Sequence, residues 1–504
     1  MPDGHVTCRR HCWECRRRCV VCDFAEPACK RCSRAGIACP GYGERKPLRY
    51  RWLTPGIVTS RGQKANKGIL QTNVDDKQPF SDARSSSKFH GAMMFPRYQL
   101  TTDLCALGDA VKYFNSCIYH ELLPLHELGP NPFVYPIVPS HLQRAATLPN
   151  HLRFSLVCTA LSHRINRTRH DPHHRHLLQT FYEYRGIVIR SLRDDARLKQ
   201  SHMSDWFIAG VVSLLLIDLQ HGVSTVWQSH IRAVQALITL RGGIEPLARS
   251  GKLDSLLLCF IGISVLGNTT CPASDIVLTD QHRKELEFMV DKFGSTTFAF
   301  QMCPASLFAE ITRINSLRMR ARKSHNPSTL QQDMVFEAHS ILRRIGDFSP
   351  SEWVKSKPSG TSPWQTLGFI CKSATALYCI LSLQSALLLP CTQHLARLLD
   401  EHAQALYALL QEAISVSSIK RLVLWPLIVL GVEAAERDGW HMQIFVRRQL
   451  VEMSSYLGSH APLAAKALLE KFWTSGETKW DLCFDRAYAF AAQFAVDISR
   501  ISVM

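Results

Sequence analysis

The sequence predicts an all-α protein with a small cysteine-rich module at its N-terminus, and three observations lead to this fold class. Eight of the 18 cysteines precede residue 40. The first 100 residues carry 19 Lys and Arg against 8 Asp and Glu, whereas the other 404 carry 40 against 34. Beyond about residue 103, apolar residues recur at steps of three and four, which is typical of helices. A basic head therefore precedes a nearly neutral helical body. Such a head favours a polyanionic partner, nucleic acid before membrane, although a solvated tail would have the same composition.

Six cysteines of the N-terminal block form a repeat in which the spacing C-x2-C-x6-C occurs twice. They are Cys12, Cys15, Cys22, Cys29, Cys32 and Cys39. In a reducing compartment such a block favours metal binding over disulfides. A C-x2-C pair can place two thiolates on one zinc ion. Six thiolates fill the eight ligand positions of two tetrahedral zinc ions if two of them bridge both metals. The spacing therefore predicts a binuclear cluster with two Zn²⁺ per chain, which would staple a module too small for a core of its own.

The residues between these cysteines carry a resemblance to a known family. They are Cys12-Trp13-Glu14-Cys15-Arg16-Arg17-Arg18, Cys22-Asp23, Pro27-Ala28-Cys29-Lys30-Arg31-Cys32 and Arg34-Ala35-Gly36-Ile37-Ala38-Cys39-Pro40-Gly41-Tyr42. This stretch resembles the Zn2Cys6 binuclear-cluster domain of fungal transcription factors, and we assign it to residues 8–42. The resemblance implies that Cys12 and Cys29 bridge the two zinc ions and that Pro27 shapes the loop between the halves. The alternative is a zinc-stapled module that only holds protein partners.

The resemblance also implies a short helix, Arg16–Val21, that enters the major groove of DNA and recognises CGG-type triplets. The candidate DNA contacts are Arg16, Arg17 and Arg18, because a guanidinium can donate to O6 and N7 of guanine or to a phosphate.

The chain departs from the family pattern on this helix. Cys19 and Val21 stand where the family usually has lysine, and this puts triplet specificity and affinity in question, though not zinc binding. Cys8 and Cys19 lie outside the six-ligand pattern. They are either ordinary thiols or, for Cys19 among several arginines, an oxidation-prone thiol of lowered pKa.

Residues 43–102 are predicted to be a flexible basic linker, because Gly, Pro and Ser are frequent there and no helical or strand period persists. The stretch Glu44–Trp52 resembles the basic segment that often follows the cluster in this family, and it could contact phosphates or form part of a nuclear address. Between residues 41 and 105 we find no run of heptads for a coiled coil. If the protein forms a homodimer, the contact is therefore expected in the helical body.

Residues 103–504 are predicted to fold as a large, all-helical regulatory domain. The helices are expected at Leu107–Leu123, Leu152–Ile165, Leu177–Leu192, Met203–Leu219, Ser224–Arg241, Leu253–Leu266, Leu307–Met319, Val335–Ile345, Thr366–Leu389, Leu395–Ile414, Leu422–Ala435, Ile444–Leu457 and Ala461–Phe472. Gly242-Gly243 supplies a helix stop, and Pro426 fits the first turn of a helix.

Two segments of this body, Trp227–Gly243 and Leu424–Ala434, resemble the signature of the fungal-specific transcription factor domain. His230, within the first of them, is expected to be a helix-face residue satisfied by packing and not a catalyst.

One histidine cluster of the body could bind a metal. It comprises His163, His170, His173, His174 and His176. A polar interhelical loop is the stronger interpretation, because no paired carboxylate or regular spacing accompanies these histidines. The sequence contains no nucleotide-binding, hydrolase or metalloprotease motif, which argues against an enzyme. It also lacks an uninterrupted apolar stretch of membrane-spanning length and a secretory signal, so we expect no membrane partner and an intracellular location.

The resemblance thus implies a fungal transcription regulator of the nucleus, whose zinc-cluster helix binds double-stranded DNA and whose helical domain sets activity through unknown protein co-regulators, effectors or self-association. Regulators of this kind often control a neighbouring biosynthetic gene cluster for secondary metabolism. The alternative is a co-regulator that keeps the zinc module for interaction and has lost specific DNA recognition, as Cys19 and Val21 suggest. An enzyme is the third hypothesis, and no motif supports it.

Overall fold

The computed structural model confirms the all-α prediction, since the part of the chain that it describes contains helices and no strand. The described residues are 12, 14–15, 22–25, 27–37, 39, 97–129, 134–145, 147–169, 174–198, 204–222, 227–277, 280–294, 303–323, 329–357, 362–436 and 439–490. The chain divides into two compact units, Met1–Gly91 and Ala92–Met504. The predicted recognition helix, Arg16–Val21, and most of the predicted linker lie outside the described residues.

In the N-terminal unit, the described residues gather around cysteine sulfurs in place of an apolar core. One short helix, α2 (Lys30–Arg34), lies between Cys29 and Cys39. It begins at Cys29, whose extended backbone and side-chain sulfur cap the first turn. It ends at a turn in which Gly36 adopts a φ of 65°, a conformation that favours glycine.

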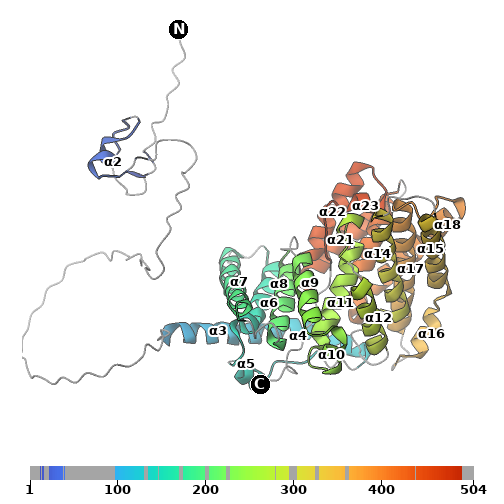
Figure 1. The fold of residues 1–504 in the computed structure, drawn as a ribbon, viewed down its shortest axis with the longest axis horizontal. Coiled ribbons are helices and arrows are strands. Elements are labelled where there is room, and N and C mark those ends of the chain that lie inside the picture. Colours follow the sequence, from blue (N-terminus) through green and yellow to red (C-terminus); the bar gives the residue numbers. More distant parts are fainter. Residues whose placement is uncertain are drawn as a thin grey trace, which may run out of the picture. The chain divides into compact units, whose positions relative to one another are not determined.

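The C-terminal unit is a body of packed helices that stand largely side by side in Figure 1. The longer helices are α3 (Arg97–Tyr113), α6 (Asn150–Arg167), α7 (His174–Ala196), α8 (Asp205–His221), α9 (Trp227–Leu240), α11 (Asp254–Thr269), α12 (Asp280–Gly294), α14 (Ala305–Lys323), α15 (Thr329–Asp347), α17 (Ser362–Ser385), α18 (Gln393–Ala413), α20 (Leu424–Glu433), α21 (Trp440–Leu457) and α22 (Ala461–Ser475). The shorter ones are α4 (Tyr119–Leu122), α5 (Pro139–Ala145), α10 (Ile244–Arg249), α16 (Pro350–Lys355), α19 (Ser417–Lys420) and α23 (Trp480–Cys483).

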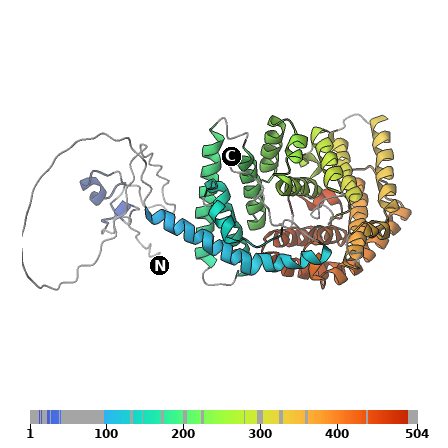
Figure 2. The ribbon, with the colours of Figure 1, turned by 90° about the horizontal axis from the view of Figure 1, so that it is seen from below.

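The first helix of the body continues well past its α-helical part. α3 passes into a π-helical turn, η1 (Phe114–Ile118), then into α4 and the 3-10 segment η2 (Leu123–Leu128). Figure 2 shows this run along one side of the body. At the π turn, the Asn115 side chain pairs with the backbone N–H and C=O of Ile137, at 2.8 and 2.9 Å. The side chain thereby ties the long run to the loop that precedes α5.

Helix ends in the body follow from local capping chemistry. α8 begins after Ser204, whose hydroxyl accepts from the Trp206 N–H, and it ends at Gly222 in the left-handed conformation. α9 ends as predicted at Gly242-Gly243, where both residues have positive φ and the Gly243 N–H donates to the Ile238 carbonyl at 2.9 Å. These two stops are the clearest cases in which residue type alone sets a boundary.

α17 is the central helix of the body. It packs against α14, α15, α16, α18, α20 and α23. It is long and apolar enough to cross a membrane by length and composition, but 89% of its apolar window is buried inside the structure, as in the core helix of a globular domain. The predicted helix ran to Leu389, whereas α17 ends at Ser385, because the backbone turns at Leu387 with a φ of 59°.

Candidate metal centre

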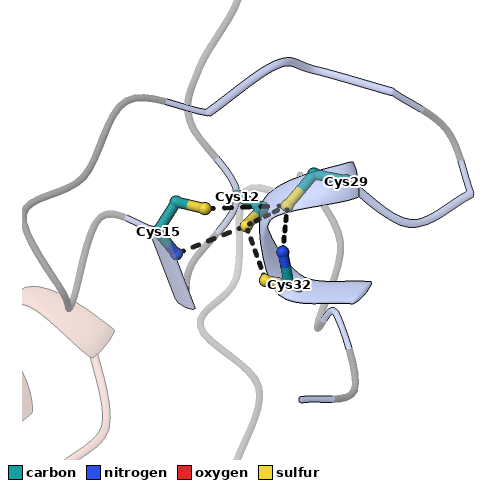
Figure 3. Close-up of side chains that lie close together, drawn as sticks. All are labelled: Cys12, Cys15, Cys29 and Cys32. Carbon is teal, nitrogen blue, oxygen red and sulfur yellow. Dashed lines mark hydrogen bonds between the residues drawn. The ribbon is translucent and has the colours of Figure 1, made fainter. Parts of the chain in front are cut away.

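Four cysteine sulfurs converge in the N-terminal unit, as Figure 3 shows. The Sγ atoms of Cys12 and Cys29 lie 3.7 Å apart, those of Cys12 and Cys32 lie 3.7 Å apart, and those of Cys15 and Cys29 lie 3.6 Å apart. Two sulfurs bound to one tetrahedral zinc at a Zn–S distance of about 2.3 Å would be about 3.8 Å apart. The sulfur spacing therefore suits a shared metal ion, and all four side chains are buried.

Both C-x2-C pairs adopt the same local geometry. The backbone N–H of Cys15 donates to the Sγ of Cys12 at 3.4 Å, and that of Cys32 donates to the Sγ of Cys29 at 3.3 Å. A side chain that caps the first turn of a helix makes the same contact to an N–H three residues later. The contact holds the two sulfurs of each pair on the same side of the turn. The sequence repeat is thus a structural repeat, with each half presenting two thiols.

The thiols of this cluster would need a bound cation in order to ionise. Burial, together with contacts to neighbouring thiols, raises the pKa of Cys32 to about 12 and also raises the pKa of Cys12 and Cys15. Several thiolates cannot share so small a buried volume without charge compensation. A bound divalent metal deprotonates its thiols and supplies that compensation. The donor set, thiolate sulfur in tetrahedral spacing, is the one that zinc prefers.

The remaining predicted ligands lie at the edge of this cluster. Cys22 is buried and its sulfur lies close to that of Cys29, while Cys39 is partly buried and packs against the cluster. Asp23 joins Cys22 and Cys29 in a second possible ligand group, and its carboxylate accepts from the Lys30 N–H at 3.1 Å. Asp23 was not predicted as a potential ligand, although it directly follows the predicted ligand Cys22 in the sequence.

The predicted DNA-contacting residues, Arg16, Arg17 and Arg18, lie outside the described residues, as do Cys8, Cys19 and Val21. In the described part of this unit, the exposed cations belong to α2. They are Lys30, Arg31 and Arg34. They lie on the helix that carries Cys32, and positive charge near thiolates favours the ionised form.

In the body, three tryptophans meet residues at the carboxyl end of α11. Trp425 donates its indole N–H to the Thr269 hydroxyl at 2.9 Å, and Trp480 donates to the Thr269 carbonyl at 3.0 Å. Trp227 packs on Gly267, where a Cβ would lie 2.8 Å from the indole ring. The two segments that resemble the family signature, one containing Trp227 and the other Trp425, thus contribute to one packed centre.

A buried arginine completes this centre. Arg318 of α14 is fully buried and donates to the carbonyls of Asn268, Thr269 and Cys271, to the Tyr378 hydroxyl and to the Asp481 carboxylate. The ion pair with Asp481 measures 2.5 Å. Because this arginine joins α11, α14, α17 and α23, its role is to fix the packing of the body.

The histidines singled out in the sequence are structural in the described part of the body. His163 lies within α6 and not in a loop, where it contacts Glu121 at 3.1 Å and the Tyr113 hydroxyl at 3.0 Å. His170 and His173 lie outside the described residues, and His174 and His176 are in the first turn of α7. His230 contacts Asp218 at 3.3 Å, so a polar partner, and not packing alone, satisfies it.

Comparisons with known proteins agree with this architecture. Residues 110–485 match the model of the fungal specific transcription factor domain. The chain is 40% identical over 499 residues to the phomenoic acid biosynthesis cluster-specific transcriptional regulator of Leptosphaeria maculans. The aligned region is 98% of this chain and 91% of that relative. It is 33% identical over 73 residues to arginine metabolism regulation protein II of Saccharomyces cerevisiae, or 13% of this chain and 8% of that relative. No solved structure matches significantly. The chain therefore belongs to the fungal-specific transcription factor domain family and is a transcription regulator.

Proposed function

We propose that this chain is a nuclear, sequence-specific DNA-binding regulator of a biosynthetic gene cluster, with a zinc cluster that recognises CGG-like triplets. The observation that carries the proposal is the convergence of the Cys12, Cys15, Cys29 and Cys32 sulfurs at distances suited to a shared zinc. Cys22 and Cys39 would complete the ligand set. The relative from Leptosphaeria maculans, named as a biosynthesis cluster regulator, supports the assignment to secondary metabolism.

In the proposed mechanism the six thiolates would hold two zinc ions, and the metal would supply the cross-links that a module of this size lacks. The chain's own residues then do the recognition. Arg16, Arg17 and Arg18 would lie on a helix that begins at the second cysteine, so that their guanidinium groups face the major groove. A bidentate contact from one arginine to guanine O6 and N7 gives sequence preference, while contacts to phosphates set the position on the duplex.

The metal content is tested with the purified full-length chain. We expect two zinc ions per chain by inductively coupled plasma mass spectrometry. Cys12→Ser or Cys29→Ser should reduce the content of both ions, because these two thiolates are the proposed bridges. Cys391→Ser is the matched control, since Cys391 is an exposed cysteine of the body. A content of one zinc in the unaltered chain would contradict the binuclear cluster.

DNA recognition is tested by fluorescence anisotropy on duplexes with and without CGG triplets. Specific binding should depend on zinc and should be lost on chelation, with circular dichroism of the helical body unchanged. Affinity is measured at several salt concentrations, because phosphate contacts make it fall as salt rises.

The second candidate is a co-regulator whose zinc module serves protein interaction only. Cys19 and Val21 favour it, because neither side chain supplies the cation that lysine would place on the recognition helix. Equal affinity for CGG-containing and scrambled duplexes, in a protein that holds two zinc ions, would support this candidate against the first. For the first candidate, the DNA-binding regulator, we also propose a homodimer that forms through the helical body and suits paired half-sites on DNA. Sedimentation analysis of the full-length chain tests it.

A further inference from the structure

The chain continues after α23 as a non-helical segment, Phe484–Phe490, that packs into the body, and we call it the clasp segment. Two of its aromatic rings, those of Tyr488 and Phe490, stack with their centres 5.5 Å apart and an angle of 10° between them. Four of its seven side chains are buried, and they are Phe484, Tyr488, Ala489 and Phe490. The clasp segment is therefore seated in the body by its apolar side chains without forming a helix.

Main-chain hydrogen bonds fasten the clasp segment to α9 and to the end of α11. The Trp227 indole N–H donates to the Ala487 carbonyl at 3.2 Å. The Tyr488 N–H donates to the Thr270 carbonyl at 3.1 Å, and the Tyr488 carbonyl accepts from the Thr270 hydroxyl at 2.8 Å. Pairing of this kind depends on the backbone of the seated segment, and it is how many peptide-recognition sites gain affinity.

Side-chain fit at the same site is set by a close approach to α11. A Cβ at Gly267 would lie 3.3 Å from the Ala489 Cβ and 2.8 Å from the Trp227 ring. A longer side chain in place of Ala489 would therefore meet α11. The side chains that suit the site are thus an aromatic, a small and a second aromatic residue in succession, and such alternate side chains supply specificity in peptide recognition.

The outer side of the clasp segment is only weakly tied. Asp485 and Arg486 are exposed. Asp485 pairs with Lys471 at 3.1 Å, but both side chains are largely in solvent, where an ion pair contributes little. Opening of the segment would expose its apolar side chains but would unwind no helix. Segments of this kind open locally at a lower free energy than packed helices.

We propose that the site formed by Trp227, Gly267 and Thr270 is a docking site for a peptide of a separate co-regulator protein, and that the clasp segment fills it as an internal ligand. The peptide of the partner carries the same succession of aromatic, small and aromatic residues and pairs its main chain with Trp227 and Thr270. Because the clasp segment is tethered, it competes at an effective concentration on the order of millimolar. The partner therefore binds tightly only when the clasp is weakened.

The first test is hydrogen exchange of the full-length chain, purified with its zinc and followed by peptide mass spectrometry. Amides of the clasp segment should exchange at least about a hundredfold faster than those of Ala374–Leu383 in α17. Their rate should not respond to urea below the unfolding transition, because local opening exposes little surface. If the two sets of amides exchange at the same rate, the segment opens only when the body unfolds, and the proposal fails.

The second test uses a fluorescent peptide with the sequence of residues 484–490. Tyr488→Pro in the full-length chain removes both the ring and the N–H that pairs with Thr270. By anisotropy, the peptide should bind this variant at least about tenfold more tightly than the wild type, because the internal competitor is weakened. A variant that keeps its helical circular dichroism but does not bind the peptide would overturn the proposal. So would loss of helical structure in the variant, since the segment would then be part of the core.

Matched controls address composition and position. A peptide of the same composition, in which the residues matching Ala487 and Tyr488 are exchanged, should not bind. Leu482→Ala removes an exposed apolar side chain just before the clasp segment, so this variant should bind the peptide as weakly as the wild type. Binding of the exchanged peptide, or tight binding by Leu482→Ala, would contradict the proposed fit.

A second copy of the chain is the competing occupant, and sedimentation of the wild type and of Tyr488→Pro distinguishes it. An association state that is the same in both proteins supports a separate partner. A wild-type dimer that dissociates in Tyr488→Pro would show that the clasp segment is exchanged between copies, and it would overturn the assignment to a co-regulator. The site lies within the helical body, so these outcomes do not depend on which DNA the zinc cluster recognises.

Discussion

At the scale of single residues, Arg318 is a fully buried polar side chain that joins several helices of the body. Its guanidinium binds three backbone carbonyls, the Tyr378 hydroxyl and Asp481 inside the core. Replacing it with methionine would leave the buried partners unpaired, and we expect the free energy of unfolding to fall by about 3–5 kcal/mol. Arg320 on the same helix pairs with Glu337 at the surface. Arg320→Met should cost about 1 kcal/mol or less. Urea unfolding of both variants, followed by circular dichroism, checks the difference, and similar losses would contradict the role of Arg318.

Glu433 makes the stability of the body depend on pH. Burial, with smaller effects from the charges of Glu436 and Asp400, raises its pKa to about 8. The folded state therefore holds a proton that the unfolded state releases above its ordinary pKa of 4.5. The stability that this proton provides is present at low pH and is lost as the pH rises towards 8. At pH 9, Glu433→Gln should raise the free energy of unfolding by about 1–3 kcal/mol relative to the wild type.

The control for this prediction is Glu401→Gln, since Glu401 is an exposed side chain next to Asp400. Its effect should stay within about 0.5 kcal/mol at every pH. Urea unfolding from pH 5 to pH 9 tests both variants. If the stability of the Glu433→Gln variant changes with pH in the same way as that of the wild type, Glu433 is not the cause of the pH dependence.

The burial of Arg318 could not have been recognised from the sequence, because this residue stands in a helical pattern in which a charged side chain is normally solvated. Its partners come from helices far apart in the chain, and a single sequence does not encode their approach locally. Glu433 differs, because it ends the almost uninterrupted apolar run Leu424–Glu433, and a helix that is apolar on every side is expected to be buried. The cysteine cluster was predictable for the opposite reason. Its sulfurs are brought together by two C-x2-C turns, and the spacing of a turn is a local property.

At the scale of elements, the sequence predicted helices whose ends carry capping residues and whose apolar face is continuous. α8 and α9 are of this kind, with Ser204, Gly222 and Gly242 at their boundaries. α12 was missed, because its sequence is strongly charged and charged residues interrupt its apolar positions. The π turn Phe114–Ile118 coincides with the pairing of Asn115 with Ile137, and no local sequence pattern indicates this pairing.

The recognition helix Arg16–Val21 is the element whose chemistry departs furthest from its family. A thiol at position 19 is short, neutral and a weak hydrogen-bond donor, so it cannot replace a lysine contact. Cys19→Lys should strengthen binding to CGG-containing duplexes by about 1–3 kcal/mol if the amine reaches a base. If the amine reaches a phosphate, the slope of the logarithm of the binding constant against the logarithm of the salt concentration should steepen by about one unit.

Arg18→Ala is the companion variant and should weaken binding. Fluorescence anisotropy at several salt concentrations measures all three proteins, with zinc content checked in each. An unchanged affinity and salt slope in Cys19→Lys, at two zinc ions per chain, would mean that the helix does not dock as proposed.

At the scale of the whole molecule, charge and packing separate along the chain. The unit Met1–Gly91 contains the cysteine cluster and most of the basic excess, while Ala92–Met504 contains the apolar core. The charge asymmetry and the clustering of cysteines are visible from composition, without any knowledge of contacts. The arrangement of helices within the body was not predictable, since it depends on which apolar faces meet.

DNA binding is expected to reside in the N-terminal part of the chain and regulation in the helical body. If the cluster alone recognises DNA, residues 1–100 should bind a CGG-containing duplex with the specificity of the full chain. The affinity of this fragment should be lower than that of the full chain only by the amount that self-association of the body adds to DNA binding. Residues 103–504 should be mainly helical by circular dichroism and should bind the duplex only weakly, because the near balance of charges in the body gives it little attraction to phosphates. Anisotropy on both fragments and on the full chain at one salt concentration makes the comparison. DNA binding by the isolated body as tight as that of the full chain would place the nucleic-acid surface on the helices and would contradict this division.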